Sequence, residues 1–157
     1  MNPHRPAAEQ MTAECLCFRA RRVSRALTRM YDEALRPLGI QATQLTLLNA
    51  IAMTGDAGTM GRLSGILAMD QTTLSRNLRP LEKAGWARIE RLPADRRVRV
   101  ARLTPEGERM IADALPLWTQ AHARVVATLG TDAAADLRDR FDATAAAAAL
   151  SPALAAG

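Results

Sequence analysis

The stretch of sequence that decides the fold is residues 62–107, which read RLSGILAMDQTTLSRNLRPLEKAGWARIERLPADRRVRVARLTPEG. Its first half, with the two residues before it, predicts two short helices joined by the tight turn Ala68-Met69-Asp70. Asp70 is a good N-cap for the second helix, because a carboxylate there accepts hydrogen bonds from the free amides of the first turn. Gly85 is a good stop just past the end of this helix.

The second half of the stretch predicts a β-hairpin. Strand-like runs at residues 87–92 and 98–103 flank the polar tip at 93–97. Two short helices joined by a tight turn and followed by a hairpin are typical of a winged helix-turn-helix, whose second helix enters the major groove of DNA. The sequence therefore predicts a mainly α-helical fold with a winged helix-turn-helix DNA-binding region at residues 41–107.

Long amphipathic helices are predicted on both sides of this region. One spans about 13–36, another begins at Thr104 and Pro105, and each carries apolar positions at 4-3-4-3-4 spacing. The two stripes consist of Leu16, Ala20, Val23, Leu27, Met30 and Ala34, and of Ile111, Leu115, Trp118, His122, Val125 and Leu129. A domain of this size cannot cover such stripes alone, so we expect a homodimer through residues 13–40 and 108–150.

The remaining parts of the chain complete a single intertwined domain. Residues 1–12 are expected to form a flexible N-terminus and residues 151–157 a tail. Thr43 is expected to cap a helix that ends near residue 54, and Thr131 to cap a last, alanine-rich helix that runs to about residue 150.

The charge distribution points to nucleic acid. The chain carries a net charge of +5, and residues 62–109 hold 11 basic and 6 acidic residues, so the whole excess lies in this segment. All basic residues except Lys83 are arginine, whose guanidinium forks onto phosphate and onto guanine edges.

Several other classes of protein are disfavoured. No apolar run is long enough to cross a bilayer and the first ten residues lack the apolar centre of a signal peptide, so no membrane partner is expected. Two cysteines are too few to stabilise a small secreted protein through disulfide bonds, which favours a reducing cytoplasm. Without a glycine-rich phosphate loop, a His-Glu-x-x-His motif or a nucleophile elbow, we expect neither enzyme activity nor a cofactor. A protein that coats DNA without sequence preference remains an alternative.

Five short motifs in this order resemble the MarR family of bacterial transcription regulators. They are Leu-x-x-x-Leu from Leu63, Asp-x-x-Thr-x-Ser-Arg from Asp70, Leu-Glu-x-x-Gly from Leu81, Asp-Arg-Arg from Asp95 and Leu-Thr-x-x-Gly from Leu103. With the long flanking helices, the resemblance covers about residues 13–150. It implies a regulator, most often a repressor, that binds a pseudo-palindromic double-stranded DNA operator.

The candidate DNA-binding residues lie in the second short helix and in the hairpin tip. They are Gln71, Thr72, Thr73, Ser75, Arg76 and Arg79, and Asp95, Arg96 and Arg97. The helix N-terminus brings partial positive charge and spare amides to phosphate, while arginine pairs with guanine or with the backbone. At the tip, Asp95 is expected to hold one arginine while the other points outward, and the resemblance implies that a tip arginine enters the minor groove. Pro80 predicts a kink or an early end of the helix.

The resemblance also implies an effector between the dimer helices and the winged region, either a small aromatic or phenolic acid or an oxidant. For an acid, the candidate ligand residues are Arg19, Arg22, Trp118 and His122.

Cys15 and Cys17 provide the alternative, a thiol or metal sensor. In a helix the two thiols would point about 200° apart. In extended chain they would share a face and could bind a thiophilic metal, with His4 as a further ligand.

Overall fold

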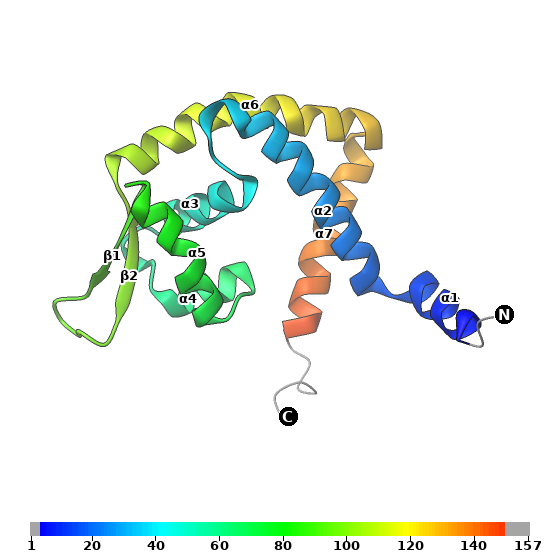
Figure 1. Cartoon of the computed structure of the whole chain (residues 1–157), viewed down its shortest axis with the longest axis horizontal. Helices are drawn as coiled ribbons and strands as arrows, with labels where there is room; N and C mark the ends of the chain where they lie inside the picture. The colour runs from blue at the N-terminus through cyan, green and yellow to red at the C-terminus, as the bar shows by residue number, and fades with distance from the viewer. Residues whose placement is uncertain (1–3, 150–157) are drawn as a thin grey trace.

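The computed structural model describes residues 4–149, which form seven α-helices, two strands and two 3-10 turns (Figure 1). In chain order these are α1 (Arg5–Glu14), α2 (Leu16–Leu35), η1 (Arg36–Leu38), α3 (Ala42–Thr54), η2 (Gly55–Ala57), α4 (Met60–Leu67), α5 (Gln71–Lys83), β1 (Ala87–Arg91), β2 (Arg99–Leu103), α6 (Pro105–Leu129) and α7 (Thr131–Ala149). The mainly α-helical winged fold predicted from the sequence is confirmed. The predicted tail, 151–157, lies outside the described residues.

The elements form an arch (Figure 1). The winged region, made of α3, α4, α5 and the β1–β2 hairpin, stands at one end, and α2 and α7 descend at the other. Helix α6 runs along the top between them and packs against α2, α3 and α7. Among the helices of residues 4–149, none is both long and apolar enough to cross a bilayer.

The core of the winged region is built from leucines of three short helices. Leu48, Leu63, Leu74 and Leu78 are buried completely or almost completely, with exposed fractions of 0–1%. Ile66 of α4 does not share this core, because it is 52% exposed. In an eight-residue helix only one narrow face is covered by neighbours, and Ile66 lies outside that face.

The hairpin is tied to the helices at its base. Ala87 pairs with Leu103 and Arg91 with Arg99, in antiparallel register. The backbone of β2 also meets the turn before α4, because the Ala101 amide donates to the Gly58 carbonyl at 2.9 Å. A Cβ added at Gly58 would lie 2.8 Å from the Ala101 oxygen, so this close approach of two backbones requires glycine.

The glycine of the Leu-Thr-x-x-Gly motif has a similar role. Thr104 caps α6 through its Oγ1, which accepts from the Gly107 amide at 3.1 Å and donates to the Gly85 carbonyl at 2.6 Å. A Cβ on Gly107 would lie only 2.0 Å from the carbonyl oxygen of Trp86. The motif therefore fixes the angle at which α6 leaves the hairpin.

The apolar stripe predicted on α6 is not the face buried within the chain. The buried positions of α6 are Gly107, Ala114 and Ala121, whereas Leu115 and Leu129 are 59% and 44% exposed. On α2 the same pattern holds, since Leu16 is 70% exposed and only Leu35 is buried. Both stripes are thus largely uncovered in a single copy.

Some local predictions were wrong. Residues 5–12, expected to be flexible, belong to α1, and Cys15 with extended backbone separates α1 from α2. Helix α3 is capped by Gln41 rather than Thr43, and Thr131 is the first residue of α7 rather than its cap.

Helix α5 does not end early at Pro80 but continues to Lys83. Pro80 and Arg76, whose carbonyl has no amide partner at Pro80, both lie on the exposed face, so water can satisfy this oxygen. Leu78 and Leu81 hold the opposite face in the core.

Candidate nucleic-acid interface

The N-terminus of α5 is shaped by its cap. Asp70 Oδ1 accepts from the Thr73 amide at 2.8 Å, and Oδ2 accepts from the Thr73 hydroxyl at 2.6 Å. These hydrogen bonds hold the pKa of the Asp70 carboxyl below its usual range. The cap is therefore complete above that pKa and is lost as the pH falls through it. Thr73, one of the predicted DNA-binding residues, is also the partner of this cap through its amide and its hydroxyl.

The other predicted residues of α5 lie together. Gln71, Thr72, Ser75, Arg76 and Arg79 line one shallow concavity on the outer face of the helix. The two arginines are exposed and follow the first turn by one and two turns, so Arg79 keeps its place beside Arg76 despite Pro80. Partial positive charge at the helix end and two guanidinium groups along the same face make this a surface for anions.

Backbone and side-chain hydrogen bonds hold the turn that leads into α5, among them one from the Met69 amide to the Ser64 carbonyl at 3.0 Å. Ala68 adopts a left-handed conformation with φ of 49°, and its amide donates to the Gly65 carbonyl. Asn77, which sequence analysis did not single out, donates from its side-chain nitrogen to the sulfur of Met69 at 3.7 Å. The turn is thereby bonded to α4 on one side and, through Asn77, to α5 on the other.

At the hairpin tip, the Asp95 carboxylate accepts a hydrogen bond from a backbone amide rather than from a guanidinium group. Its Oδ1 accepts from the Arg97 amide at 2.9 Å, and its carbonyl accepts from the Val98 amide at 3.0 Å. The predicted division between one held and one outward arginine was therefore wrong. Arg96 and Arg97 are both exposed, because the carboxylate is used by the turn itself.

Two more arginines belong to this tip and were missed. Arg91 and Arg99 face each other in the register of the two strands, and both are exposed. No ion pair among residues 4–149 involves either of them. Cross-strand arginines of this kind repel one another, which indicates a surface that receives an anion. Their equal distances from the turn at 93–97 were the signal in the sequence.

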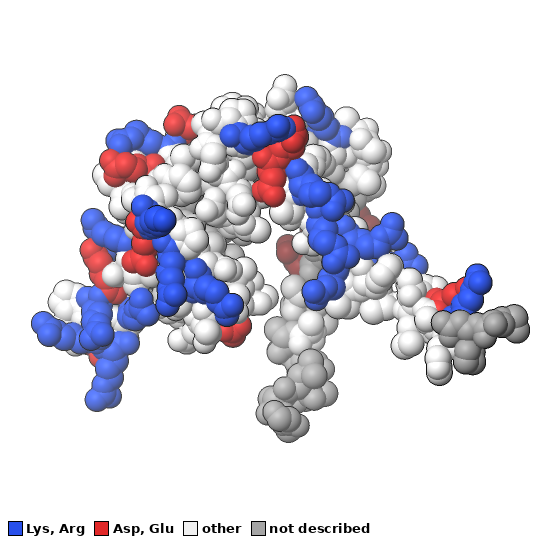
Figure 2. Space-filling model, in the orientation of Figure 1, with Lys and Arg blue, Asp and Glu red and all other residues white. Residues whose placement is uncertain are grey.

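At the base of the hairpin, by contrast, the arginines are neutralised by carboxylates. Arg88 pairs with Glu90 at 2.7 Å, and Arg102 contacts both Glu90, at 3.4 Å, and Asp56. Figure 2 shows the resulting distribution, with basic side chains gathered over the hairpin and α5 at one end of the arch and in a row along α2 at the other.

The predicted ligand residues separate into two groups. Trp118 stacks on His122, with ring centroids 4.7 Å apart, and His122 Nδ1 lies 3.1 Å from the Tyr31 hydroxyl. Arg19 and Arg22 lie about 14–18 Å from Tyr31 towards the N-terminus of α2, at 1.5 Å per residue, and line one hollow beside α1 and a second along α2 itself. Tyr31 was missed by sequence analysis, because its contact with His122 joins residues 91 positions apart.

A cavity at the junction of α2, α3 and α7 adjoins the aromatic cluster. It has a volume of about 420 Å³ and includes Tyr31 in its wall. The other lining residues are Ala20, Val23, Ser24, Leu27, Thr28, Ala42, Thr43, Thr46 and Phe141. The wall is apolar with several hydroxyl groups and has no charged side chain. Burial raises the pKa of the Tyr31 phenol, so its hydroxyl stays protonated at neutral pH.

Both cysteines are free and exposed. Cys15 is the N-cap of α2, and its sulfur accepts from the Phe18 amide at 3.3 Å, whereas Cys17 lies inside the helix. Within residues 4–149, no three His, Cys, Asp or Glu side chains are placed to hold a metal ion together.

Comparison with known proteins agrees with this arrangement. A sequence profile described as the MarR family matches residues 38–98. The transcriptional regulator MosR of M. tuberculosis, in complex with DNA, is 34% identical over 85% of this chain and 98% of its own, with a TM-score of 0.73. A mutant MarR from E. coli complexed with operator DNA is 26% identical over 85% and 96%, with a TM-score of 0.74.

A third structure shows the fold alone. CouR from Rhodococcus jostii RHA1, bound to p-coumaroyl-CoA, is 21% identical over 85% of this chain and 93% of its own, with a TM-score of 0.71. No curated protein matches the chain.

The hairpin, the exposed first turn of α5 and these likenesses define a winged helix-turn-helix DNA-binding protein. The chain belongs to the MarR family of transcriptional regulators.

Proposed function

We propose that the chain acts as a homodimeric repressor that binds a pseudo-palindromic operator and leaves it when a small aromatic or phenolic acid binds. The observation that carries the DNA-binding part is the pairing of two anion-binding surfaces: the concavity on α5 with Arg76 and Arg79, and the hairpin tip, whose arginines have no ion pair among the described residues. The first reads the major groove, and the second anchors the protein beside it.

The exposed apolar stripes support the dimer. Leu16 and Val23 on α2, Leu115 on α6 and Phe141 on α7 are 38–70% exposed in a single copy. A second copy that covers these side chains would add a second α5 helix, and a two-fold symmetric operator with half-sites about one turn of DNA apart requires such a pair.

The cavity at the junction of α2, α3 and α7 supports the effector. Its volume of about 420 Å³ suits a single-ring ligand, whose ring would pack on Val23, Leu27 and Phe141. The carboxylate or phenol of the ligand would accept a hydrogen bond from the hydroxyl of Thr28, since the hydroxyl of Thr46 already donates to the Ala42 carbonyl at 2.9 Å. Because helices of the dimer and of the winged region share this wall, a ligand there favours one separation of the two winged regions.

A thiol-sensing regulator is the second candidate. It is favoured by the position of Cys15 and Cys17, which are exposed at the break between α1 and α2. Oxidation of an exposed thiol at such a break would alter how α1 continues into α2.

The decisive experiment measures release from the operator in two variants. Ser24→Phe fills the cavity, and Cys15→Ser/Cys17→Ser removes both thiols. With fluorescence anisotropy on a footprinted operator, we expect salicylate to release the double cysteine variant and the native protein alike. Ser24→Phe should bind the operator normally but resist salicylate, and Ser24→Ala is its matched control.

Three outcomes would contradict the proposal. A cysteine variant that never leaves the operator would favour the thiol sensor. Protection of all DNA rather than a short pseudo-palindrome would indicate a coating protein. A light-scattering mass equal to one 17.0 kDa chain at micromolar concentration would exclude the dimer.

A further inference from the structure

A groove along α2 is lined mostly by arginine. Its wall consists of Arg19, Arg22, Val23, Arg25, Ala26 and Arg29, and its volume is about 540 Å³. The four guanidinium groups extend over a length of about 15 Å, at 1.5 Å per residue. Within residues 4–149 no carboxylate lines the groove, and residues 15–31 contain neither Asp nor Glu.

These arginines are not neutralised within the described part of the chain. Arg19 donates to the Ala13 carbonyl at 2.5 Å, and the Arg22 guanidinium lies 5.8 Å from the centre of the Phe18 ring. None of the ion pairs formed among residues 4–149 involves the four arginines. Like charges three and four residues apart destabilise a helix, and cations in its first turns oppose the helix dipole. An anion in the groove would remove both costs.

The groove shares Val23 with the apolar stripe and with the junction cavity, but its arginines occupy a different face of α2. At 100° per residue, its arginines are centred about a third of a turn from the apolar stripe that begins at Leu16. They face away from the cavity lined by Ser24, Thr28 and Tyr31, which occupies the opposite side of the helix. A dimer formed through the apolar stripe and a ligand in the junction cavity would therefore leave the arginine face open.

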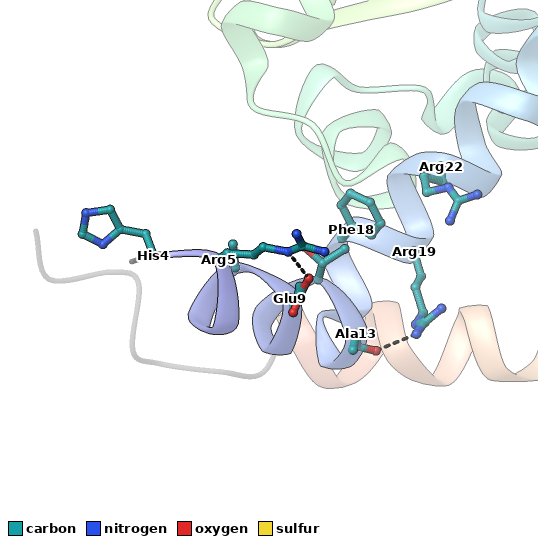
Figure 3. Close-up of a pocket in the computed structure, with 9 residues that line it drawn as sticks. His4, Arg5, Glu9, Ala13, Phe18, Arg19 and Arg22 are labelled. Atoms are coloured by element: carbon teal, nitrogen blue, oxygen red, sulfur yellow. Dashed lines mark hydrogen bonds and ion pairs between the residues drawn. The ribbon is translucent and has the colours of Figure 1, made fainter. Parts of the chain in front are cut away.

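An exposed aromatic ring stands at the N-terminal end of the groove. Phe18 is 38% exposed and shares a second hollow with Arg19 and Arg22, so the two hollows meet at these arginines (Figure 3). In Figure 3 the Phe18 ring lies beside Arg22, while Arg19 turns towards Ala13. The order along the helix is thus an aromatic ring followed by a row of cations.

We propose that this groove binds a nucleoside di- or triphosphate, with the phosphates on Arg22, Arg25 and Arg29 and the base against Phe18. A single carboxylate is too short to engage cations spread over about 15 Å, whereas a phosphate chain presents several anionic oxygens to successive guanidinium groups. The base would stack on the aromatic face as bases do in other protein sites. This site goes beyond operator binding and release, since neither requires these arginines.

Isothermal titration of the full chain with ADP and with inorganic tripolyphosphate tests the proposal. The double variant Arg25→Gln/Arg29→Gln should weaken both ligands by about ten- to hundredfold, because it removes two charge-assisted hydrogen-bonding groups. Arg21→Gln/Arg124→Gln is the matched control, since it removes the same charge from exposed positions outside the groove and should change affinity by less than about twofold. Phe18→Leu should weaken ADP but not tripolyphosphate.

Four results would overturn the proposal. Native protein that gives no heat with either ligand has no such site, and equal losses in the two double variants would show only a net-charge effect. A groove variant whose dimer dissociates at higher protein concentration than the control would assign the arginines to a second copy. A smaller salt dependence of operator binding in the groove variant would assign them to DNA. Unchanged circular dichroism confirms that the variants are folded.

Discussion

The base and the tip of the hairpin both contain cross-strand arginines, but their electrostatic environments differ. At the base, Arg88 faces Arg102, and Glu90 and Asp56 compensate both. At the tip, Arg91 faces Arg99, and the described ion pairs include neither. The position of carboxylates across the strands, rather than the number of arginines, therefore separates the arginines that form ion pairs from those that form none among the described residues.

The largest expected effect on DNA affinity comes from substitutions at the hairpin tip. Arg96→Ala/Arg97→Ala should weaken binding to every duplex by about ten- to hundredfold and lower the salt slope by roughly 0.9 for each phosphate that the variant no longer neutralises. Arg76→Ala, by contrast, should cost about 1–3 kcal/mol of discrimination between operator and unrelated DNA. Anisotropy at several salt concentrations measures both. If both variants lose affinity for operator and for unrelated DNA in the same proportion, then either the hairpin also recognises bases or α5 does not recognise them.

Two single substitutions, one at the base of the hairpin and one at its tip, should change the free energy of unfolding in opposite directions. Arg102→Ala breaks the ion pairs with Asp56 and Glu90 and should lower the free energy of unfolding by about 0.5–1 kcal/mol, an amount kept small by solvent screening. Arg99→Ala relieves repulsion with Arg91 and should raise it by up to about 0.5 kcal/mol while weakening DNA binding. Urea denaturation gives the stabilities. If both variants are destabilised equally, the tip arginines are structural as well.

The smallest effect is expected at the carboxylate of the tip. Asp95→Asn keeps an oxygen that can accept from the Arg97 amide but removes a negative charge from a surface that meets phosphate. Affinity for all duplexes should rise by about two- to threefold at low salt and return to the native value at high salt. A loss of affinity would instead show that the ionised carboxylate is needed to hold the turn.

Local signals in the sequence were sufficient for the winged region. Asp70, Gly85 and Thr104 mark helix ends by properties of single residues, and the structure places each of them at the predicted end. The five α5 residues that share one concavity were also predicted, because their spacing along a helix determines which face they occupy. Thr73 differs because its hydroxyl reaches the cap three residues before it.

Features that depend on distant residues were not predictable in the same way. The contact between Tyr31 and His122, and the separation of Arg19 and Arg22 from Trp118, depend on where α2 crosses α6.

The sequence by itself determined the winged helix-turn-helix, the ends of its second helix and the concentration of arginine in it, because caps, glycines and apolar spacing act over a few residues. Only the tertiary structure decided which arginines of residues 4–149 are neutralised by a carboxylate, and which apolar residues of α2 and α6 stay uncovered. Both depend on what a side chain meets across strands and between helices, and those neighbours are far away along the chain.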